Sequence, residues 1–227
     1  MEEFTRTEWL IGSDKLDLLK NSAVAVFGIG GVGSYTAEAL ARCGIGKLLL
    51  VDSDTVSLSN INRQIIALHS TIGKLKTEVM RERIQDINPK CSVITENIFY
   101  TSPTDIDLCG FDYIVDAIDT VSSKLTLISQ AKNLNIPIIS SMGTGNKLNA
   151  SRFQITDIKK TTVCPLARVM RRELKSRGIS DLKVLFSDET PISQNTVGRP
   201  IPASISFVPS VAGLLIAGEV IRDITGV

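Results

Sequence analysis

The stretch Ser22-Ala23-Val24-Ala25-Val26-Phe27-Gly28-Ile29-Gly30-Gly31-Val32-Gly33 decides the fold of this chain. Its first half, Ser22 to Phe27, is short, apolar and rich in β-branched residues, which predicts a buried parallel strand. In the turn that follows, Gly28 permits a tight exit from the strand, Gly30 lets the backbone approach a phosphate, and Gly33 allows a helix to pack closely on the sheet. The N-terminus of that helix offers free N–H groups and a partial positive charge to an anion.

The segments around this turn predict an α/β fold with an open, mostly parallel sheet and helices on both faces, a Rossmann-like arrangement. Val32 to Cys43 has helical spacing, and Lys47 to Val51 is a second strand that closes one βαβ unit. After Gly145 the pattern changes, and Ser151 to Ile158 alternates like an exposed strand, so we expect some antiparallel pairing in the C-terminal part. The other expected strands are Ser92 to Asn97, Phe111 to Ile118, Ile136 to Ser140 and Leu182 to Ser187, and the other expected helices are Lys74 to Ile87, one ending near Asn133, Leu166 to Lys175 and Val208 to Ile224.

Length and composition limit the architecture and the compartment. A chain of 227 residues with 43% apolar residues fits one domain with a sizeable core. The acidic start and the lack of a run of about 18 apolar residues argue against a signal peptide and a membrane span. The four cysteines form no C-x-x-C pair, so we expect free thiols in a reducing cytoplasm and no four-thiolate zinc site.

A carboxylate follows the second strand at the position where sheets of this kind hold a ribose. Asp52 lies at the tip of that strand, 19 residues past Gly33, and can accept hydrogen bonds from ribose hydroxyls. With a strand before the glycine turn and a helix after it, the pattern predicts a site for an adenosine nucleotide. The turn and Asp52 do not distinguish NAD from ATP, so a nucleotide-binding oxidoreductase stays open at this point.

The polar stretch after Asp52 favours ATP. A dehydrogenase usually enters the next helix directly, whereas this chain has 21 residues from Ser53 to Gly73, and such long loops in a compact domain are usually functional or disordered. Arg63 supplies a planar fork of donors suited to phosphate oxygens, and Lys76, or alternatively Lys74, adds a point charge near a helix start. Together these cations would hold a triphosphate and stabilise the charge on departing pyrophosphate.

The motifs resemble those of the adenylating enzymes of the ubiquitin-activating type. That family shares G-x-G-G-x-G, D-x-D-x-V-x-x-S-N-x-x-R-Q, G-x-x-K and D-A-x-D, which match residues 28–33, 52–64, 73–76 and 116–119. The resemblance implies a single adenylating domain over residues 1–227, with a half for ATP and Mg²⁺ in 1–145 and a substrate-side half in 146–227. The nucleotide-binding residues that it implies are Gly28, Gly30, Gly31, Gly33, Asp52, Asp54, Asn60, Arg63, Gln64, Lys76 and Asp119.

The same resemblance implies four catalytic residues. Arg63 and Lys76 address the phosphates, and Asp119 is the metal carboxylate that reaches the triphosphate through Mg²⁺. The family also supplies an arginine from the N-terminal segment of a partner subunit, and Arg6 sits at the matching distance from the first strand, which implies a homodimer. Small residues along the C-terminal helix offer a surface for the dimer or for core packing. From the residues alone, Asp119 has an alternative role as a helix N-cap.

The second half resembles one branch of the family, the tRNA threonylcarbamoyladenosine dehydratases. Asp157 to Lys175, Phe186 to Glu189 and Ser204 to Gly213 carry this resemblance, and one departure is Cys164, where that branch has an aspartate. The branch implies ATP-dependent adenylation of the carboxylate of threonylcarbamoyladenosine, at position 37 of tRNA, and its cyclisation with net loss of water. The alternative is an adenylyltransferase that activates the C-terminal glycine of a small ubiquitin-like sulfur-carrier protein, but the usual C-x-x-C zinc pairs are missing.

Charge in the second half agrees with a tRNA partner. From Lys159 to Lys183 eight basic residues stand against two acids, a local charge of +6 in a chain of net charge +1. Phosphate backbones bind such patches in a salt-dependent way, although a solvated amphipathic helix would have the same charges. The residues that we expect to bind nucleic acid are Lys159, Lys160, Arg168, Arg171, Arg172 and Lys175.

Other segments carry minor expectations. Cys164 has nothing beside it that looks like a base, and Pro165 is an ordinary helix start, so we interpret the thiol as structural. His69, the only histidine, is interpreted as structural or as a loop contact. Asp188 to Ser204 is expected to be a mobile loop, and Gly143 to Lys147 follows a strand where an acyl substrate would sit.

Overall fold

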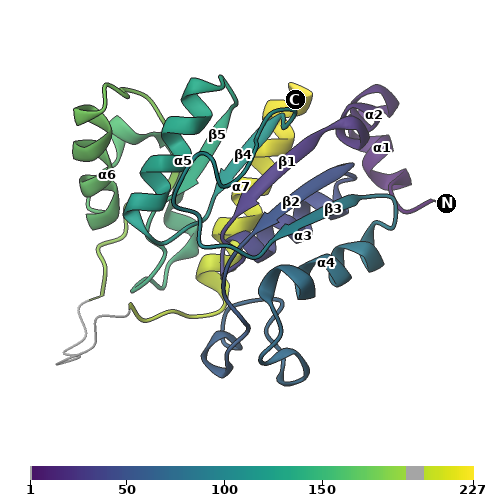
Figure 1. Cartoon of the computed structure of the whole chain (residues 1–227), viewed down its shortest axis with the longest axis horizontal. Coiled ribbons are helices and arrows are strands. Elements are labelled where there is room, and N and C mark those ends of the chain that lie inside the picture. Colours follow the sequence, from purple (N-terminus) through teal and green to yellow (C-terminus); the bar gives the residue numbers. More distant parts are fainter. Residues whose placement is uncertain (1, 193–201) are drawn as a thin grey trace.

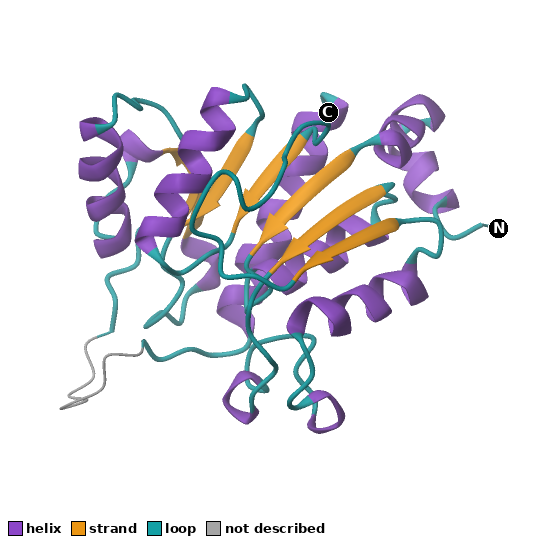
Figure 2. Ribbon diagram, in the orientation of Figure 1, coloured by secondary structure: helices purple, strands orange, loops and turns teal. Residues whose placement is uncertain are grey.

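The computed structural model describes residues 2–192 and 202–227, which form a sheet between two groups of helices (Figures 1 and 2). In chain order the elements are α1 (Thr5–Ile11), α2 (Ser13–Asn21), β1 (Ala23–Phe27), α3 (Gly33–Arg42), β2 (Lys47–Val51), η1 (Leu58–Asn60), η2 (His69–Thr71), α4 (Lys76–Ile87), β3 (Ser92–Glu96), β4 (Tyr113–Asp116), α5 (Val121–Asn133), β5 (Ile138–Ser141), η3 (Ala150–Arg152), β6 (Phe153–Asp157), η4 (Ile158–Lys160), α6 (Pro165–Ser176), β7 (Lys183–Ser187) and α7 (Phe207–Thr225). The strand order is β3-β2-β1-β4-β5-β7-β6, and all neighbours are parallel except β6 and β7. The predicted fold class is confirmed, including its antiparallel pair.

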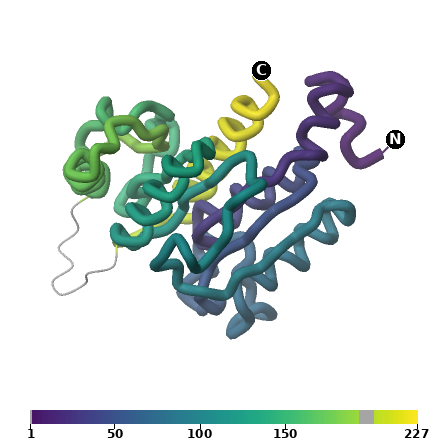
Figure 3. Tube along the Cα trace, turned by 45° about the horizontal axis from the view of Figure 1, so that its top comes forward, coloured from purple at the N-terminus to yellow at the C-terminus, as the bar shows by residue number. Residues whose placement is uncertain are grey.

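The first strand buries side chains on both faces of the sheet, which explains its continuous apolar run. Val24 and Val26 pack into the core that α3, α4 and α7 cover, whereas Ala25 and Phe27 pack into the core that α5 and α6 cover. Figure 3 shows α7 running between the N-terminal helices on one side and α6 on the other. At the two edges, β3 and β6 are more exposed than the central strands. For β6 this confirms the exposed strand that the alternation from Ser151 to Ile158 predicts.

The strand order reverses beside β1, and this reversal positions the site. β1 pairs in parallel with β2 on one side and with β4 on the other. Chain connections therefore leave β1 and β4 in opposite directions, which opens a crevice at their carboxyl ends.

The small residues of α7 serve the core. An added Cβ at Gly213 would lie 2.4 Å from the carbonyl oxygen of Val32, so only glycine permits this approach to α3. Thr36 Oγ1 also donates to the Gly213 carbonyl oxygen at 3.0 Å. Of the two roles suggested for these small residues, close packing within the chain is the one that this contact supports.

The observed bounds differ from the predicted ones where tertiary contacts intervene. The helix predicted from Lys74 begins at Lys76, because Leu75 forms a β-bridge with Thr55 and the Lys74 carbonyl oxygen accepts from Val56 N–H. The strand predicted over 111–118 is shorter, since the Asp116 carboxylate accepts from Ile118 N–H and turns the chain. Helices α1 and α2 were not predicted. Of the predicted mobile loop, residues 193–201 lie outside the described residues.

No helix in the described ranges combines the length and the apolar character needed to cross a membrane.

Candidate functional site

A cavity of about 620 Å³ lies at the carboxyl ends of β1, β2 and β4. Every predicted nucleotide-binding residue lines it except Gly33. Gly33 instead has the predicted packing role, because an added Cβ would lie 1.8 Å from the Gly28 carbonyl oxygen. The structure therefore brings together residues from four separate sequence motifs at the crevice that the strand reversal creates.

The glycine turn is held open by its own geometry. Gly28 has a φ of +87°, and an added Cβ would lie 2.6 Å from the Ala117 carbonyl oxygen, so this position requires glycine. Gly30 has no atom closer than 3.8 Å to such a Cβ and faces the cavity. Helix α3 begins directly after the turn and has no side-chain cap. Ser34 N–H donates to the Gly30 carbonyl oxygen at 3.1 Å, and the remaining N–H groups at the helix start are available to an anion because no side chain caps them.

Asp52 fixes the turn and faces the cavity. Its carboxylate accepts from Ile29 N–H at 2.7 Å and from Asp54 N–H at 2.8 Å. Burial raises the pKa of this carboxyl above its ordinary value, while Lys76 and the two hydrogen bonds oppose the rise without cancelling it. Asp52 therefore joins the glycine turn to the next strand, and its remaining lone pairs are available to a ribose.

Two cations approach the cavity from the long polar stretch and the helix after it. Lys76 is buried, with Nζ 2.7 Å from Asp54 Oδ2 and 3.9 Å from Asp52 Oδ1. Arg63 donates to the Ser59 carbonyl oxygen at 2.8 Å and to Asn62 Oδ1 at 2.9 Å, both uncharged acceptors. Lys74, the alternative lysine, is exposed and does not line the cavity.

Two buried polar atoms in the cavity wall have no hydrogen-bond partner. They are Gln64 Oε1 and Ser123 Oγ, and the described part of the chain has no other buried side-chain nitrogen or oxygen without a partner. Both residues line the same cavity. Buried polar atoms are normally hydrogen-bonded, so their common placement indicates a polar ligand. Sequence reasoning found Gln64 and missed Ser123, whose position in the first turn of α5, just after the D-A-x-D motif, was the available signal.

Asp119 presents a free carboxylate at the cavity. Its one described hydrogen bond comes from Thr120 Oγ1 at 3.3 Å. The N-cap residue of α5 is Thr120, and no side chain caps that helix, so the N-cap alternative for Asp119 is wrong. No group of three or more His, Cys, Asp or Glu side chains that could hold a metal occurs in residues 2–192 and 202–227. One carboxylate with phosphate oxygens and water fits Mg²⁺, which seldom needs a full protein cage.

A buried ion pair supports the Asp119 loop. Lys124 and Asp116 are fully buried, with Nζ and Oδ2 3.0 Å apart. Lys124 Nζ also donates to the Ile118 carbonyl oxygen at 3.0 Å, and Ser140 Oγ donates to Asp116 at 2.6 Å. The pair therefore holds the backbone on the N-terminal side of Asp119. Sequence reasoning quoted Asp116 within the motif but did not find Lys124.

The rest of the cavity wall is less polar. It comes from residues after β3, from the end of β5 and the loop that follows it, from the start of α6 and from the segment before α7: Ile98, Phe99, Tyr100, Ser141, Met142, Gly143, Thr144, Gly145, Leu166, Pro202 and Ser204. Gly143 to Gly145 belong to the predicted acyl loop. Lys147, at the end of that loop, points elsewhere, because its buried Nζ donates to the Glu189 carbonyl oxygen at 2.7 Å.

A family model described as the ThiF family matches residues 5–227. The chain belongs to the ThiF family. It is 46% identical over 241 residues to a tRNA threonylcarbamoyladenosine dehydratase of Bacillus subtilis (strain 168), with 99% of this chain and 95% of that protein covered. It is also similar to crystal structures of Escherichia coli tRNA N6-threonylcarbamoyladenosine dehydratase, TcdA, in complex with AMP (TM-score 0.92) and with ATP (TM-score 0.90). In both comparisons the sequence identity is 35%, and 99% of this chain and 94% of the other are covered.

In this ThiF-family chain the predicted nucleic-acid contacts lie on and beside α6. The helix buries Ala167, Met170 and Leu174 and exposes Arg168, Arg172 and Lys175, whose spacing places them on one stripe. Among the described residues, Arg172 alone of the six predicted contacts has a carboxylate partner, Glu173 at 3.0 Å. Lys159 and Lys160 are exposed in η4.

Two cations of the basic segment, residues 159–183, are less available to nucleic acid than the sequence alone indicates. Arg171 is half-buried and donates to the carbonyl oxygen of Thr161 at 2.8 Å and to its hydroxyl. Lys183, counted in the basic segment, pairs with Glu219 at 2.8 Å and with Asp223 at 2.6 Å. The exposed cations of the segment therefore concentrate on the outer stripe of α6 and on η4.

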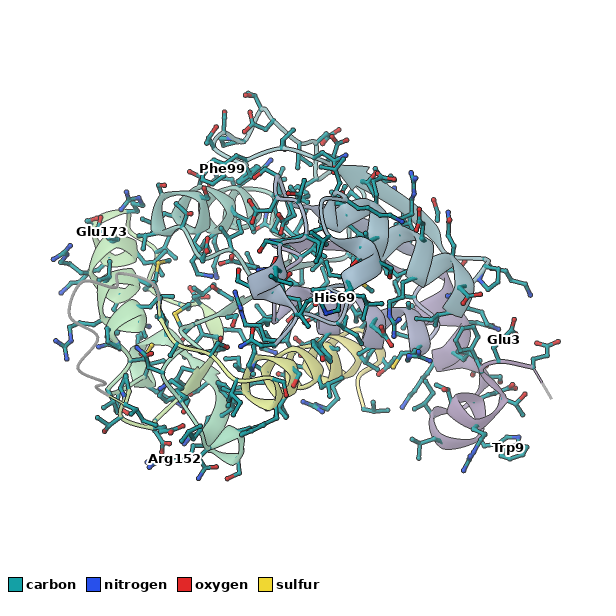
Figure 4. All side chains as sticks on the ribbon, turned by 90° about the horizontal axis from the view of Figure 1, so that it is seen from below. Glu3, Trp9, His69, Phe99, Arg152 and Glu173 are labelled. Atoms are coloured by element: carbon teal, nitrogen blue, oxygen red, sulfur yellow. The ribbon has the colours of Figure 1, made fainter. Side chains whose placement is uncertain are left out.

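Arg6, Cys164 and His69 also lie outside the cavity. Arg6 is exposed on α1, at the opposite end of the molecule from α6, as the positions of Trp9 and Glu173 in Figure 4 show. Cys164 precedes α6 and is buried in the core beneath α5 and α6, as a structural thiol would be. His69 is exposed in η2.

Proposed function

We propose that this protein is an ATP-dependent tRNA-modifying enzyme. It adenylates the carboxylate of threonylcarbamoyladenosine at position 37 and promotes cyclisation of that nucleoside. The observation that carries the proposal is the single cavity that gathers the glycine turn, Asp52, Arg63, Lys76 and Asp119. The tRNA-modifying names of its relatives and the ATP and AMP in the E. coli structures support it.

In the first step the substrate carboxylate attacks the α-phosphorus of ATP. The bond between that phosphorus and the bridging oxygen breaks, and pyrophosphate leaves with the electron pair. Asp52 holds the ribose, and Arg63 and Lys76 stabilise the charge that develops on the phosphates. Mg²⁺, when bound by Asp119 and phosphate oxygens, supplies further neutralisation of that charge.

In the second step the carbamoyl group of the same nucleoside attacks the acyl carbon of the adenylate, releases its proton and displaces AMP, which keeps the carboxylate oxygen. A five-membered ring closes, and the nucleoside has lost one water overall. Because the nucleophile and the electrophile belong to one nucleoside, a high effective molarity favours this closure. No protein thioester is needed, which agrees with the burial of Cys164 to 2% exposure.

The tRNA and a second subunit complete the site in this proposal. The tRNA backbone lies on Lys159, Lys160 and the outer stripe of α6, so residues 146–227 form the substrate side and 1–145 the nucleotide side. Arg6 acts on the cavity of a partner subunit in a homodimer. In support, α1 has no buried residue, and Trp9 and Leu10 are 72% and 85% exposed. Free thiols throughout the described chain suit a cytoplasmic location.

The proposal is tested by incubating the protein with ATP, MgCl₂ and tRNA that carries the uncyclised nucleoside. Mass spectrometry of the digested tRNA should show a nucleoside one water lighter, and the Arg63→Ala variant serves as the inactive control. A parallel pyrophosphate-exchange assay with a sulfur-carrier protein covers the alternative. Exchange stimulated by the carrier protein and not by tRNA would reverse the assignment.

A further inference from the structure

Asn146 holds two segments that are far apart in the sequence. It has a φ of +57°, a left-handed conformation that asparagine tolerates better than most residues. Its N–H donates to the Ala203 carbonyl oxygen and its Oδ1 accepts from Ala203 N–H, both at 2.8 Å. Its own carbonyl oxygen accepts from Ile192 N–H, also at 2.8 Å. Ala203 therefore has both of its backbone polar groups satisfied by one residue.

The neighbour of Asn146 brings the same segment against the cavity. An added Cβ at Gly145 would lie 2.6 Å from Pro202 Cβ, so these two segments pack closely against each other. Both residues line the cavity. A side chain at 145 would push Pro202 away. Glycine at 145 and asparagine at 146 thus act together on residues 202–204.

A second asparagine holds the other side of this segment. Asn62 Nδ2 donates to the Ser204 carbonyl oxygen at 3.0 Å, and Asn62 Oδ1 accepts from Arg63 at 2.9 Å. Ser204 and Arg63 both line the cavity. Residues 202–204 therefore lie between the loop after β5, which we call the acyl end of the cavity, and Arg63, which marks the phosphate end. Asn146 anchors these residues on the first side and Asn62 on the second.

We propose that Asn146 and Asn62 are positioning residues that fix residues 202–204 as the wall between the acyl end and the phosphate end of the cavity. This wall sets how the RNA carboxylate approaches ATP, so the inference rests on the proposed function. Asn146 touches only the acyl side of the wall, whereas Asn62 touches the wall and Arg63. The two residues therefore differ in their expected effects on the two substrates.

The Asn146→Gly variant isolates the contribution of one hydrogen bond. Glycine adopts a positive φ freely and keeps the backbone bonds, so only the bond from Ala203 N–H to the side chain is removed. Asn149→Gly is the matched control: it lies in the same loop, and its side chain accepts from Ser151 and makes no described hydrogen bond to residues 202–204. Asn62→Ala removes the link to Ser204 and the acceptor for Arg63.

The test measures KM for tRNA bearing the uncyclised nucleoside and KM for ATP, together with hydrogen exchange of the Ala203 amide. Asn146→Gly should raise KM for tRNA about two- to tenfold, the range expected for removing one hydrogen bond, leave KM for ATP unchanged, and accelerate exchange at Ala203. Asn62→Ala should raise both KM values. Asn149→Gly should change none of them. Asn146→Asp keeps the acceptor, so Ala203 should stay protected.

Equal KM values for Asn146→Gly and Asn149→Gly overturn the inference, as does a rise in KM for ATP as large as that for tRNA in Asn146→Gly. Unaltered exchange at Ala203 in Asn146→Gly also overturns it. Wild-type protein that converts no tRNA contradicts the proposed function instead. In that case, faster exchange of the Ala203 amide in Asn146→Gly than in Asn146→Asp supports the role of Asn146 in holding residues 202–204. Equal exchange in the two variants contradicts it.

Discussion

Arg63 donates to two uncharged oxygens, Ser59 O and Asn62 Oδ1, and therefore keeps its positive charge available to the cavity. Lys76 differs, because Asp54 lies 2.7 Å from its Nζ and partly neutralises it. Arriving phosphates must compete with Asp54 for Lys76 but meet no carboxylate at Arg63. Of the two cations, Arg63 should thus contribute more to stabilising the departing pyrophosphate.

Replacing Arg63 with alanine should lower kcat/KM for tRNA modification by about 10²- to 10³-fold, the usual loss for one preorganised electrostatic donor. The side chain is half-buried and its partners are local, so thermal unfolding should change little. The measurement is nucleoside conversion by mass spectrometry beside a melting curve. Activity within twofold of wild type at saturating ATP would exclude this role for Arg63.

Lys124→Met should lower stability, whereas Asp119→Asn should leave stability unchanged and alter the Mg²⁺ requirement of catalysis. Lys124 is fully buried against Asp116, and removing one partner of a buried pair should lower the free energy of unfolding by about 3–5 kcal/mol. Asp119 is exposed, so Asp119→Asn should unfold like wild type and need more Mg²⁺ for half-maximal rate. Chemical denaturation and Mg²⁺ titration check the pair. An unstable Asp119→Asn with unchanged Mg²⁺ dependence would contradict this division.

At the scale of elements, α6 combines a buried apolar face with an exposed cationic stripe. The exposed cations Arg168 and Lys175 have no carboxylate partner in the described part of the chain, whereas Arg172 shares Glu173 with Arg177. A structural helix would gain from pairing these charges. Their lack of partners is what a face for a polyanion requires.

The double variant Arg168→Ala/Lys175→Ala should weaken tRNA binding and flatten its salt dependence. For each phosphate that the variant no longer neutralises, the slope of log K against log salt should fall by about 0.7 to 0.9. Lys20→Ala/Lys90→Ala removes the same formal charge from exposed positions outside the basic segment and is the matched control. Filter binding or fluorescence anisotropy at several salt concentrations gives the slopes. Equal slopes for the two double variants would remove α6 from the tRNA interface.

Helices α3 and α4 are tied by Glu38, which makes their packing pH-dependent. Burial of Glu38 opposes its ionisation, but hydrogen bonds from Arg83 and Arg42 outweigh burial and hold the pKa below its ordinary value of 4.5. A lowered folded-state pKa stabilises the fold above the unfolded-state pKa, and this effect disappears as pH falls through the folded-state pKa.

Glu38→Gln should therefore lower the free energy of unfolding by about 1–3 kcal/mol at pH 7. The difference from wild type should shrink as pH falls below 4.5, because wild-type Glu38 then also becomes neutral. Urea denaturation at a series of pH values provides the comparison. A difference that grows on acidification would contradict the sign of this linkage.

At the scale of the whole molecule, α1 and the cavity lie at separate places in one chain. Helix α1 contributes no residue to the cavity lining and buries none of its own residues. Arg6 therefore does not line the cavity of its own subunit. In a dimer, Arg6 would reach the cavity of the partner subunit, and the exposed apolar residues of α1 would pack in the interface.

Subunit mixing tests the role of Arg6 in a partner. Arg6→Ala and Arg63→Ala homodimers should each be nearly inactive. A random mixture contains hybrid dimers with one intact cavity, so the mixture should recover roughly a quarter of wild-type activity. Arg6→Ala alone should still bind ATP in a fluorescence assay. Full activity of Arg6→Ala, or no recovery on mixing, would show that Arg6 does not act across subunits.

The sequence predicted the parts of this protein that depend on local pattern. The apolar strand before Gly28 and the phosphate-directed residues 52–64 each lie within a short stretch, and the sheet brings their ends together at the cavity. Contacts between distant segments were not predictable. Asn146 meets Ala203 across the site, and Lys124 is recognisable only once its burial against Asp116 is known. Helices α1 and α2 have only seven and nine residues, too few turns for a helical period to show in the sequence.

The central claim is that a carboxylate of the tRNA attacks the α-phosphorus of ATP within this cavity. It is tested most directly by labelling the substrate carboxylate with oxygen-18 and analysing the products of one turnover by mass spectrometry. Attack at the α-phosphorus followed by ring closure must transfer one labelled oxygen to AMP. Labelled AMP and unlabelled pyrophosphate are the predicted result, whereas unlabelled AMP, or label in a phosphate released from the γ position, would contradict it.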